Sequence, residues 1–580
     1  MKHYTFFLII CLPLSILHTQ NHDFNWQYGD YYSLDPSNYN HFAIDFNEEP
    51  PATYPVDREL NMNKTMVSVC DSIGNLLFYT NGIQIANFEH QIMENGDSLN
   101  PGDYANQWYE EGYFLVQSEV ILPMSGHAGL YYLFHLRIDH NNIVGLYRNT
   151  LFYSKVDMNA NNGDGKVVEK NQVMLDLTDV GRFGLLTAVK HANGRDWWIF
   201  VPEHGKNIYY YFLFTPNGLE GPYEVSMEPV FDVYTLGALV FSPDGKKMGR
   251  FETEHGLYFY DFDRCDAALS NPVFIPLPNT SLGGGLAFSP NSRFAYIAAT
   301  NSVVLQFDLW ADDVAASLDT VAVYDGYMSP VWTTFYRMQN GPDGRIYINC
   351  TNTTDVLHYI DQPNKKGETC RVMQHGLQLP FRNSYTIPHF PNYRLGPLDG
   401  SPCDTLGLDN HPVAKYRCYQ DTSDYLTVEF TDLSTYAPTA WAWDFGDGTE
   451  SQDTSPVHTF PGGGTYEVCL TVSNQYSSDT FCKTLQLGPS ATEGRPVPQA
   501  DISVFPNPAQ SFTNVRLGGD YLPRNARITL FAATGQPVHS QRLAAGWGVV
   551  PLEGLAPGIY FWEVKDDGRL MGSGKLVRVE

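Results

Sequence analysis

A turn between two apolar strands recurs along the first 400 residues, and this repeat constrains the fold more than any other feature of the chain. It reads VFSPDGKKM at residues 240–248, AFSPNSRFAYI at 287–297, QNGPDGRIYI at 339–348 and, more weakly, HANGRDWWIF at 191–200. Matching positions lie about fifty residues apart, and two further apolar strands follow each turn. A repeat of this length, built from four short strands, predicts the blades of a β-propeller.

Two earlier units fit the pattern loosely, CDSIGNLLFYT at residues 70–80 and PMSGHAGLYYLFHL at 123–136. One fragment is then left at each end of the region. IPHFPNYRL at residues 387–395 repeats the first strand and its turn, whereas residues 24–46 hold a hairpin that lacks its opening strand. Pairing the two fragments completes a seventh blade and leaves no exposed sheet edge. We therefore expect an all-β chain whose residues 21–400 form a seven-bladed propeller.

The first nineteen residues have the pattern of a secretory signal. Lys2 precedes an apolar run over residues 6–17, which is too short to cross a bilayer as a helix. We expect residues 1–19 to be a signal peptide, without lipidation, because Ile10 precedes Cys11 where a lipoprotein signal has a small residue. No other stretch approaches eighteen apolar residues, so no transmembrane helix is expected.

The chain is strongly acidic, with a formal net charge of −28. The acidic residues concentrate before the last eighty or so positions. Such a surface repels phosphate backbones, so the charge argues against nucleic-acid binding.

One cysteine pair stands out in a chain predicted to be exported. Cys469 and Cys482 lie on strands that flank a turn near residues 474–478, and mirror positions across that turn place them opposite each other. A disulfide between them is predicted. Cys403 with Cys418 and Cys350 with Cys370 are further candidate pairs, and the sequence leaves their connectivity open.

Residues 412–488 resemble a PKD domain, an immunoglobulin-like β-sandwich. TAWAWDFGDGTES at residues 439–451, PVHTF at 456–460 and GTYEVCLTVSN at 464–474 carry the resemblance in the order of the family motif. The matching positions are Trp443, Phe445, Gly446, Asp447, Gly448, His458 and Tyr466. Apolar members are expected in the sandwich core and the glycines in the turn between strands. The resemblance implies an extracellular spacer or a module that contacts proteins and glycans.

The last eighty residues alternate apolar and polar positions between turn residues, which predicts a second small sandwich. VFPNPA at residues 504–509, LAPGIYFWEV at 555–564 and GKLVRV at 574–579 together resemble the type A C-terminal sorting domain of type IX secretion substrates. The motif positions are Pro506, Asn507, Pro508, Gly558, Tyr560 and Lys575. The resemblance covers residues 501–580. It implies transport across an outer membrane, removal of the tail, and attachment to surface lipopolysaccharide or release.

Linkers are expected at residues 401–411 and 489–500, the second being rich in proline. The front region also resembles Bacteroidota surface proteins through the WQYG segment at 26–29 and NLLFYTNGIQIANFEHQIMENG at 75–96. That resemblance implies no particular activity.

The sequence contains no motif of a serine hydrolase, zinc protease, phosphate loop or sialidase. DMNANNGDGK at residues 157–166 approaches a calcium loop but has Val168 where the bidentate glutamate belongs, so a wide turn is the simpler interpretation. Asp444 and Asp447 are calcium ligands or, alternatively, caps of their own turn. The carboxylates Glu252 and Glu254 are expected on the same face of a strand. They are either a glycosidase pair or part of an acidic rim. Five histidines are candidates for convergence on the channel from separate blades: His127, His135, His191, His204 and His255.

We expect no cofactor, with calcium left open, and a secreted or outer-membrane surface location. The expected function is binding or adhesion, with the propeller face contacting an extracellular glycan or protein, after delivery by the type IX secretion machinery. The alternative is a secreted hydrolase or lyase whose site is assembled at the channel mouth from several blades.

Overall fold

The computed structural model describes residues 20–579 except 30–40, 59, 142–145, 178–183, 204–205, 228–236, 254, 278–283, 300, 421–423, 489–500, 506–508, 519–525, 533–535, 544–546, 553 and 567–568. The predicted signal peptide lies outside the described residues. The chain forms two compact units, Met1–Gln486 and Leu487–Glu580. No described helix is long and apolar enough to span a membrane.

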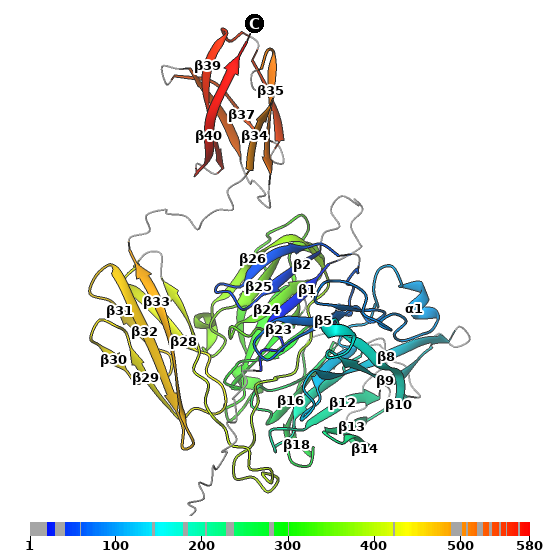
Figure 1. The fold of residues 1–580 in the computed structure, drawn as a ribbon. Helices are drawn as coiled ribbons and strands as arrows, with labels where there is room; N and C mark the ends of the chain where they lie inside the picture. The colour runs from blue at the N-terminus through cyan, green and yellow to red at the C-terminus, as the bar shows by residue number, and fades with distance from the viewer. Residues whose placement is uncertain are drawn as a thin grey trace, which may run out of the picture. The chain divides into compact units, whose positions relative to one another are not determined.

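Seven successive antiparallel sheets make up the described part of residues 25–384 (Figure 1). Sheets 1 to 4 contain β1 (Asn25–Tyr28), β2 (His41–Asp45) and β3 (Ala52–Val56); β4 (Val67–Cys70), β5 (Leu76–Thr80) and β6 (Ile85–Asn87); β7 (Glu119–Pro123), β8 (Leu130–Asn141), β9 (Leu146–Asp157) and β10 (Lys166–Leu177); β11 (Thr187–Lys190), β12 (Trp197–Glu203), β13 (Ile208–Thr215) and β14 (Gly218–Ser226).

Sheets 5 to 7 contain β15 (Ala238–Phe241), β16 (Lys247–Glu252), β17 (Gly256–Phe262) and β18 (Leu269–Ile275); β19 (Leu286–Phe288), β20 (Phe294–Ala299), β21 (Val303–Asp308) and β22 (Asp319–Val323); β23 (Phe335–Asn340), β24 (Ile346–Cys350), β25 (Thr353–Ile360) and β26 (Val372–Ser384). A short helix, α1 (Asp103–Gln107), and the 3-10 turns Asn161–Gly163, Ala315–Ser317 and Gly367–Cys370 lie in the connections.

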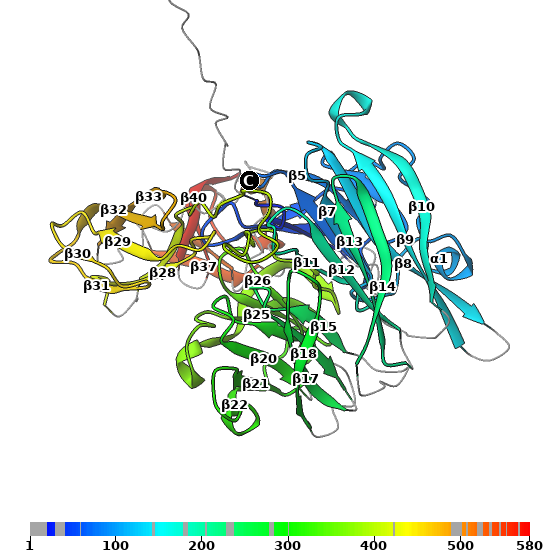
Figure 2. The ribbon, with the colours of Figure 1, turned by 90° about the horizontal axis from the view of Figure 1, so that it is seen from below.

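The first strand of each sheet is innermost, and it contacts the first strand of the next sheet from β1 through β4, β7, β11, β15, β19 and β23. These strands are almost entirely buried, whereas fourth strands such as β14 and β18 are largely exposed. Figure 2 shows the sheets of β11–β14, β15–β18 and β20–β22 side by side. A fully apolar strand must be covered on both faces, which stacking of sheets provides. The predicted propeller architecture is confirmed.

The predicted pairing between the first and last fragments is wrong. Sheet 1 is built from its own three strands with β1 innermost, and residues 387–395 form no strand. Sheet 1 instead packs on sheet 7 through side chains. The Trp26 ring lies 5.5 Å from the Tyr347 ring and 5.9 Å from that of Phe390.

Residues 385–398, named here the channel segment, run between the innermost strands after β26 ends. Its side chains and backbone reach residues of sheets on different sides of the centre. Thr386 Oγ1 donates to the Asn63 carbonyl (2.5 Å), Tyr393 donates to the Ile121 carbonyl (2.7 Å), Asn392 donates to the Pro243 carbonyl (2.8 Å), and the Leu398 N–H donates to the Ala192 carbonyl (2.8 Å). The channel segment therefore fills the centre of the propeller.

A sandwich of two sheets follows in the same unit and is named here the middle module. Its sheets contain β27 (Tyr416–Gln420), β28 (Thr427–Asp432) and β31 (Val457–Thr459), and β30 (Glu450–Ser451), β29 (Ala440–Asp444), β32 (Gly464–Ser473) and β33 (Ser478–Leu487). Cys469 and Cys482 form a disulfide between β32 and β33.

A second disulfide joins Cys265, in the turn between β17 and β18, to Cys403 just after the channel segment. The sequence did not predict this pair. The alternatives that it left open are not formed, since Cys350, Cys370 and Cys418 are free.

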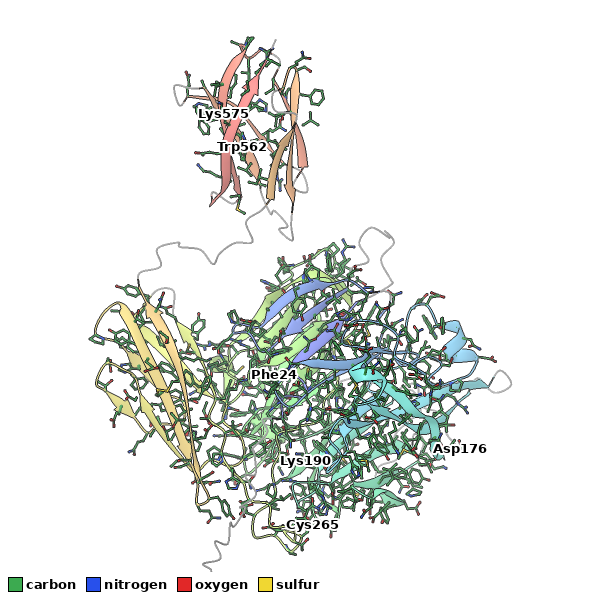
Figure 3. The ribbon with its side chains drawn as sticks, viewed as in Figure 1. Phe24, Asp176, Lys190, Cys265, Trp562 and Lys575 are labelled. Carbon is green, nitrogen blue, oxygen red and sulfur yellow. A yellow bond between two sulfur atoms is a disulfide. The ribbon has the colours of Figure 1, made fainter. Side chains whose placement is uncertain are left out.

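The second unit is a sandwich of seven described strands: β34 (Asp501–Phe505), β35 (Phe512–Gly518), β36 (Arg527–Ala532), β37 (Pro537–Arg542), β38 (Trp547–Pro551), β39 (Gly558–Asp566) and β40 (Arg569–Arg578). Figure 3 labels Trp562 on β39 and Lys575 on β40. Gly574 lies opposite Trp562, where a Cβ would meet the indole ring at 2.5 Å.

Candidate functional site

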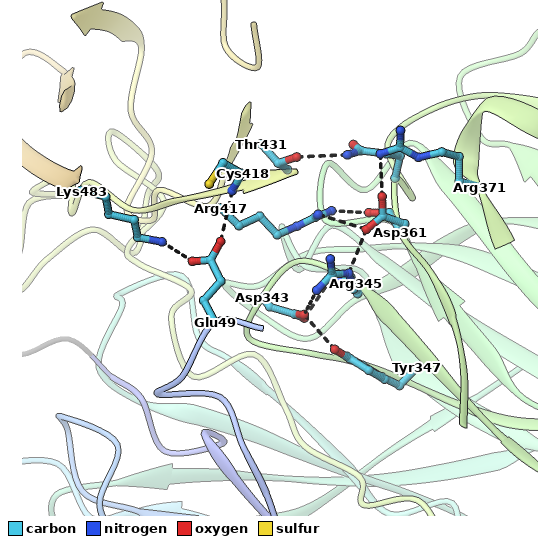
Figure 4. A network of polar contacts seen from close by, with 11 residues as sticks. Glu49, Asp343, Arg345, Tyr347, Asp361, Arg371, Arg417, Cys418, Thr431 and Lys483 are labelled. Carbon is cyan, nitrogen blue, oxygen red and sulfur yellow. Dashed lines mark hydrogen bonds and ion pairs between the residues drawn. The ribbon is translucent and has the colours of Figure 1, made fainter. Parts of the chain in front are cut away.

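The middle module is held to the propeller by a cluster of charged side chains (Figure 4). The buried Asp361 carboxylate, just after β25, accepts from Arg345 Nε (2.9 Å), Arg371 Nη2 (2.6 Å) and Arg417 Nη1 of the middle module (3.0 Å). Arg371 also pairs with Glu429 on β28 at 2.7 Å. Burial alone would raise the pKa of Asp361, but the three guanidinium groups hold it below its ordinary value. The contact is thus ionic and largely dehydrated.

Two further contacts extend this interface. Glu49, between β2 and β3, pairs with Lys483 on β33 and accepts from the Cys418 N–H at 3.1 Å. Lys415 Nζ lies 4.2 Å from the centre of the Phe24 ring. The middle module is therefore packed on the propeller and does not hang from it on a free linker.

The innermost strands finish at one end of the channel, and this end is named here the module end. A cavity of about 660 Å³ lies between the module end and the middle module. Its walls are the turns after β15, β19 and β23, the channel segment, and the loop of the middle module that leads to β29. Residues lining it include Asp244, Asn291, Asn364, Asn410, Tyr436 and Trp441. A volume of this size suits a small ligand or one end of a larger one.

Most charged groups of this cavity are already satisfied by one another or by the backbone, whereas Lys246, which also lines it, is exposed. Arg394 forms a two-point ion pair with Asp23 at 2.5 and 2.8 Å. Arg264 donates to the carbonyls of residues 190, 191 and 396. Asp432 accepts from Trp441 Nε1 at 2.9 Å, and burial raises its pKa. The walls therefore present amide, hydroxyl and aromatic groups more than free charge.

A second set of polar residues is named here the channel cluster and comprises Lys64, Gln117, Arg337, Asn349 and His389. Arg337 lies near the beginning of β23, and its Nη1 donates across the channel to the carbonyl of Gly237, just before β15, at 2.7 Å. Gln117, just before β7, lies 3.4 Å from His389 Nε2 and donates to the Leu239 carbonyl. Most of the channel cluster therefore lies toward the end where the innermost strands begin, opposite the module end, whereas His389 also lines the cavity.

Burial changes the ionisation of several groups near this opposite end. It lowers the pKa of Lys64 to about 8, with Arg337 adding to the effect, and lowers that of His389 to about 4. Burial also raises the pKa of Glu119, the first residue of β7, to about 8. Glu252, by contrast, forms a buried ion pair with Arg250 at 2.5 Å, while Glu254 lies outside the described residues.

The motif residues of the middle module take up structural positions. Trp443 and Phe445 are buried, and Tyr466 donates to the Gly462 carbonyl at 2.9 Å. Asp447 accepts from the N–H and hydroxyl of Thr449 and lies 2.8 Å from His458 Nε2.

The same holds for the remaining calcium candidates. Asp444 accepts from the Gly446 N–H, and Asp157 from the Asn159 N–H, both at 2.9 Å, so each caps its own turn. Across the residues that the structure describes, no three histidine, cysteine, aspartate or glutamate side chains are grouped for metal binding.

The histidines singled out from the sequence bond in separate places. His135 contacts Asn100 and Ser154 within sheet 3, His191 contacts the Cys265 carbonyl, and His127 is exposed in a turn. His204 lies outside the described residues, and so do Pro506, Asn507 and Pro508 of the tail. Gly558, Tyr560 and Lys575 lie on β39 and β40.

Sequence reasoning missed Lys64, Arg337, His389 and Trp441. His389 lies in the fragment at 387–395, whose apolar spacing matches the repeat and therefore predicts a strand. Trp441 lies two positions before Trp443, the first motif residue of the middle module, and nothing in the sequence separates its role from theirs. No local signal marks Lys64 or Arg337.

Two family profiles match the chain. Residues 410–487 match the PKD domain, and residues 503–578 match the secretion system C-terminal sorting domain. The tail is a type IX sorting domain. It indicates handling by the type IX secretion machinery and secretion with surface attachment or release.

Several solved structures are similar to parts of the chain. The PKD1 domain of Vibrio anguillarum Epp is 29% identical over 14% of this chain and 95% of its own, with a TM-score of 0.13. AztD from Citrobacter koseri is 10% identical over 79% of this chain and 97% of its own, with a TM-score of 0.28. The gluconolactonase XC5397 from Xanthomonas campestris is 12% identical over 57% and 84%, with a TM-score of 0.26. No curated protein matches the chain.

Proposed function

We propose that this protein, exported by type IX secretion, is a binding protein that holds a neutral glycan in the cavity at the module end. The observation that carries the proposal is the cavity itself, about 660 Å³ in volume and walled by both the propeller and the middle module. Ligand sites form preferentially at such junctions, where a concave surface excludes water from most of the ligand. The packed interface supports the proposal because it keeps the two walls in one arrangement.

The chemistry of the walls favours sugars over charged ligands. Asn291, Asn364 and Asn410 line the cavity with amide groups. Oδ1 of Asn291 and Asn364 and Nδ2 of Asn410 bond within the protein, and the other amide atom of each can pair with a hydroxyl. Trp441 and Tyr436 add aromatic surface, which covers the apolar face of a sugar ring. Because Arg394, Asp23 and Asp432 are already paired, a charged ligand would gain little from them.

A glycan array probed with the purified full chain, followed by calorimetric titration of the best neutral oligosaccharide, tests the proposal. We expect Trp441→Ala to weaken binding at least tenfold by removing the aromatic wall. Trp310→Ala is the matched control, because Trp310 is 66% exposed and does not line the cavity. Melting temperatures of both variants establish that they remain folded. Equal affinities of the two variants, or binding of acidic glycans alone, would contradict the proposal.

The enzyme alternative is tested with the same materials. A hydrolase or lyase would convert bound oligosaccharides, whereas a binding protein returns them unchanged. Chromatography of glycans after overnight incubation with the full chain distinguishes the two, and new reducing ends or unsaturated products would overturn the binding assignment.

A further inference from the structure

The channel cluster contains two cations without a counter-charge. Across the described residues, neither Lys64 nor Arg337 lies within ion-pair distance of a carboxylate, although the chain as a whole carries a net charge of −28. Arg337 is only 6% exposed. Buried charges are normally paired, because transfer out of water is costly for a lone ion. Arg417 and Arg250, two other buried arginines, pair with Asp361 and Glu252, whereas the buried Arg264 donates to three backbone carbonyls.

The unused polar atoms of the channel cluster are all donors. Arg337 Nε and Nη2 are buried and have no hydrogen-bond partner, and the same holds for Asn349 Nδ2. The Asn349 side chain is fixed beside the backbone of Arg337, because its Oδ1 accepts from the backbone N–H of Arg337 at 2.7 Å. Nε and Nη2 form one edge of the guanidinium plane, the edge that binds two oxygens of one anion.

The surroundings fix these donors without neutralising them. Arg337 Nη1 donates to the Gly237 carbonyl, and this hydrogen bond fixes the orientation of the guanidinium plane. The edge formed by Nε and Nη2 therefore points in one direction. Lys64 Nζ lies 3.6 Å from the centre of the Phe114 ring, which orients the ammonium group without supplying a full negative charge. Arg337 is close enough to Lys64 to disfavour the charge of that ammonium group.

We propose that the channel cluster binds the oxyanion group of a small ligand, with Arg337 holding two of its oxygens and Lys64 and Asn349 completing the site. Carboxylate, sulfate and phosphate groups share the required chemistry, namely negative charge on oxygens spaced for a guanidinium edge. Lys64, Arg337 and Asn349 do not line the neutral cavity, so this site does not depend on the glycan assigned there.

Thermal unfolding of the full chain tests the proposal with three probes: sodium glucuronate, sodium sulfate and sodium phosphate. Each is titrated against sodium chloride at equal ionic strength, because salts also act on stability generally. We expect at least one probe to raise the melting temperature saturably, as a ligand that binds only the folded state does. The active probe identifies which oxyanion source the site prefers.

Two variants locate the effect. Arg337→Met keeps a long side chain but removes the donors, and it should abolish the saturable rise. Without any probe it should leave the melting temperature unchanged or higher, because an uncompensated buried charge is gone. Arg382→Met, which removes an exposed arginine on β26, should respond as the parent chain does. The proposal is overturned if no probe gives a saturable rise beyond chloride, or if the Arg337→Met variant retains that rise.

Discussion

Glycines at two neighbouring turn positions of the middle module show how a single residue shapes this protein. Gly446 and Gly448 both have positive φ, at 74° and 89°. Their surroundings differ, because a Cβ at Gly446 would lie 2.5 Å from the Glu467 carbonyl oxygen, whereas nothing lies within 4 Å of one at Gly448. The first glycine is therefore required for close approach of two strands and the second only for its backbone conformation.

Replacing each glycine by alanine separates these requirements. Gly448→Ala should lower the free energy of unfolding by about 1 kcal/mol, the cost of a left-handed alanine. Gly446→Ala should cost roughly 2–4 kcal/mol, because the clash with the backbone adds to that strain. Chemical denaturation of the two variants measures both values, and equal losses would contradict the explanation.

At the scale of elements, the connection between the middle module and sheet 7 depends on one carboxylate. The Asp361 carboxylate pairs with three arginines. One of them, Arg417, comes from the middle module, and its side chain is 2% exposed. Removing one partner of a buried ion pair lowers the free energy of unfolding far more than removing one partner of a surface ion pair, because the remaining charges stay dehydrated.

Asp361→Asn should therefore lower the free energy of unfolding by about 3–5 kcal/mol and loosen the middle module from the propeller. Calorimetry should show an earlier transition of the middle module, and limited proteolysis should cut near residues 401–411. Asp312→Asn, at an exposed aspartate, serves as the control and should leave both readouts unchanged. A single transition at the parent temperature in Asp361→Asn would refute the role given to this carboxylate.

Elements with a local signal could be predicted from the sequence. The repeated turns and the motif of the middle module carry their own glycines and prolines, and the alternating pattern of the last eighty residues predicted a sandwich where β34–β40 lie. The strand predicted at 387–395 failed because Pro388 and Pro391 have no N–H to give to a ladder. Strand β3 was not predicted because Pro55 lies inside it, and proline in a sequence argues against a strand. An edge strand such as β3 tolerates proline.

The candidate sites were less predictable because they arise from contacts between distant parts of the chain. The Cys265–Cys403 bond spans 138 residues, and Arg337 meets the Gly237 carbonyl 100 positions away. Nothing local to these residues encodes the partner. The cavity at the module end likewise exists only because the middle module folds back onto the propeller.

At the scale of the whole molecule, buried histidines couple the stability of the propeller to pH. Burial lowers the pKa of His22, His41 and His358 to about 4 and that of His135 to about 3. Between about pH 6.5 and those values the unfolded chain binds protons that the folded chain does not. Stability therefore falls as the pH is lowered through this window.

Each such histidine should contribute up to about 1.4 kcal/mol per pH unit to that fall. His135→Asn should therefore reduce the slope of unfolding free energy against pH by up to this amount between pH 6 and 4. His127→Asn, at an exposed turn position, should not change the slope. Denaturant titrations at a series of pH values measure both slopes, and an unchanged slope in His135→Asn would count against the assignment.

The channel segment has a consequence for the order in which the chain assembles during synthesis. Asp23, at the start of the propeller, pairs with Arg394 across 371 positions, and Trp26 packs on Phe390. The strands made first thus find their lasting neighbours only when nearly the whole propeller has left the ribosome. Contacts so distant in sequence form slowly, because a long loop must close before they contribute. We expect the early sheets to remain open during translation, and the ring of sheets to settle around its centre in a late, single step.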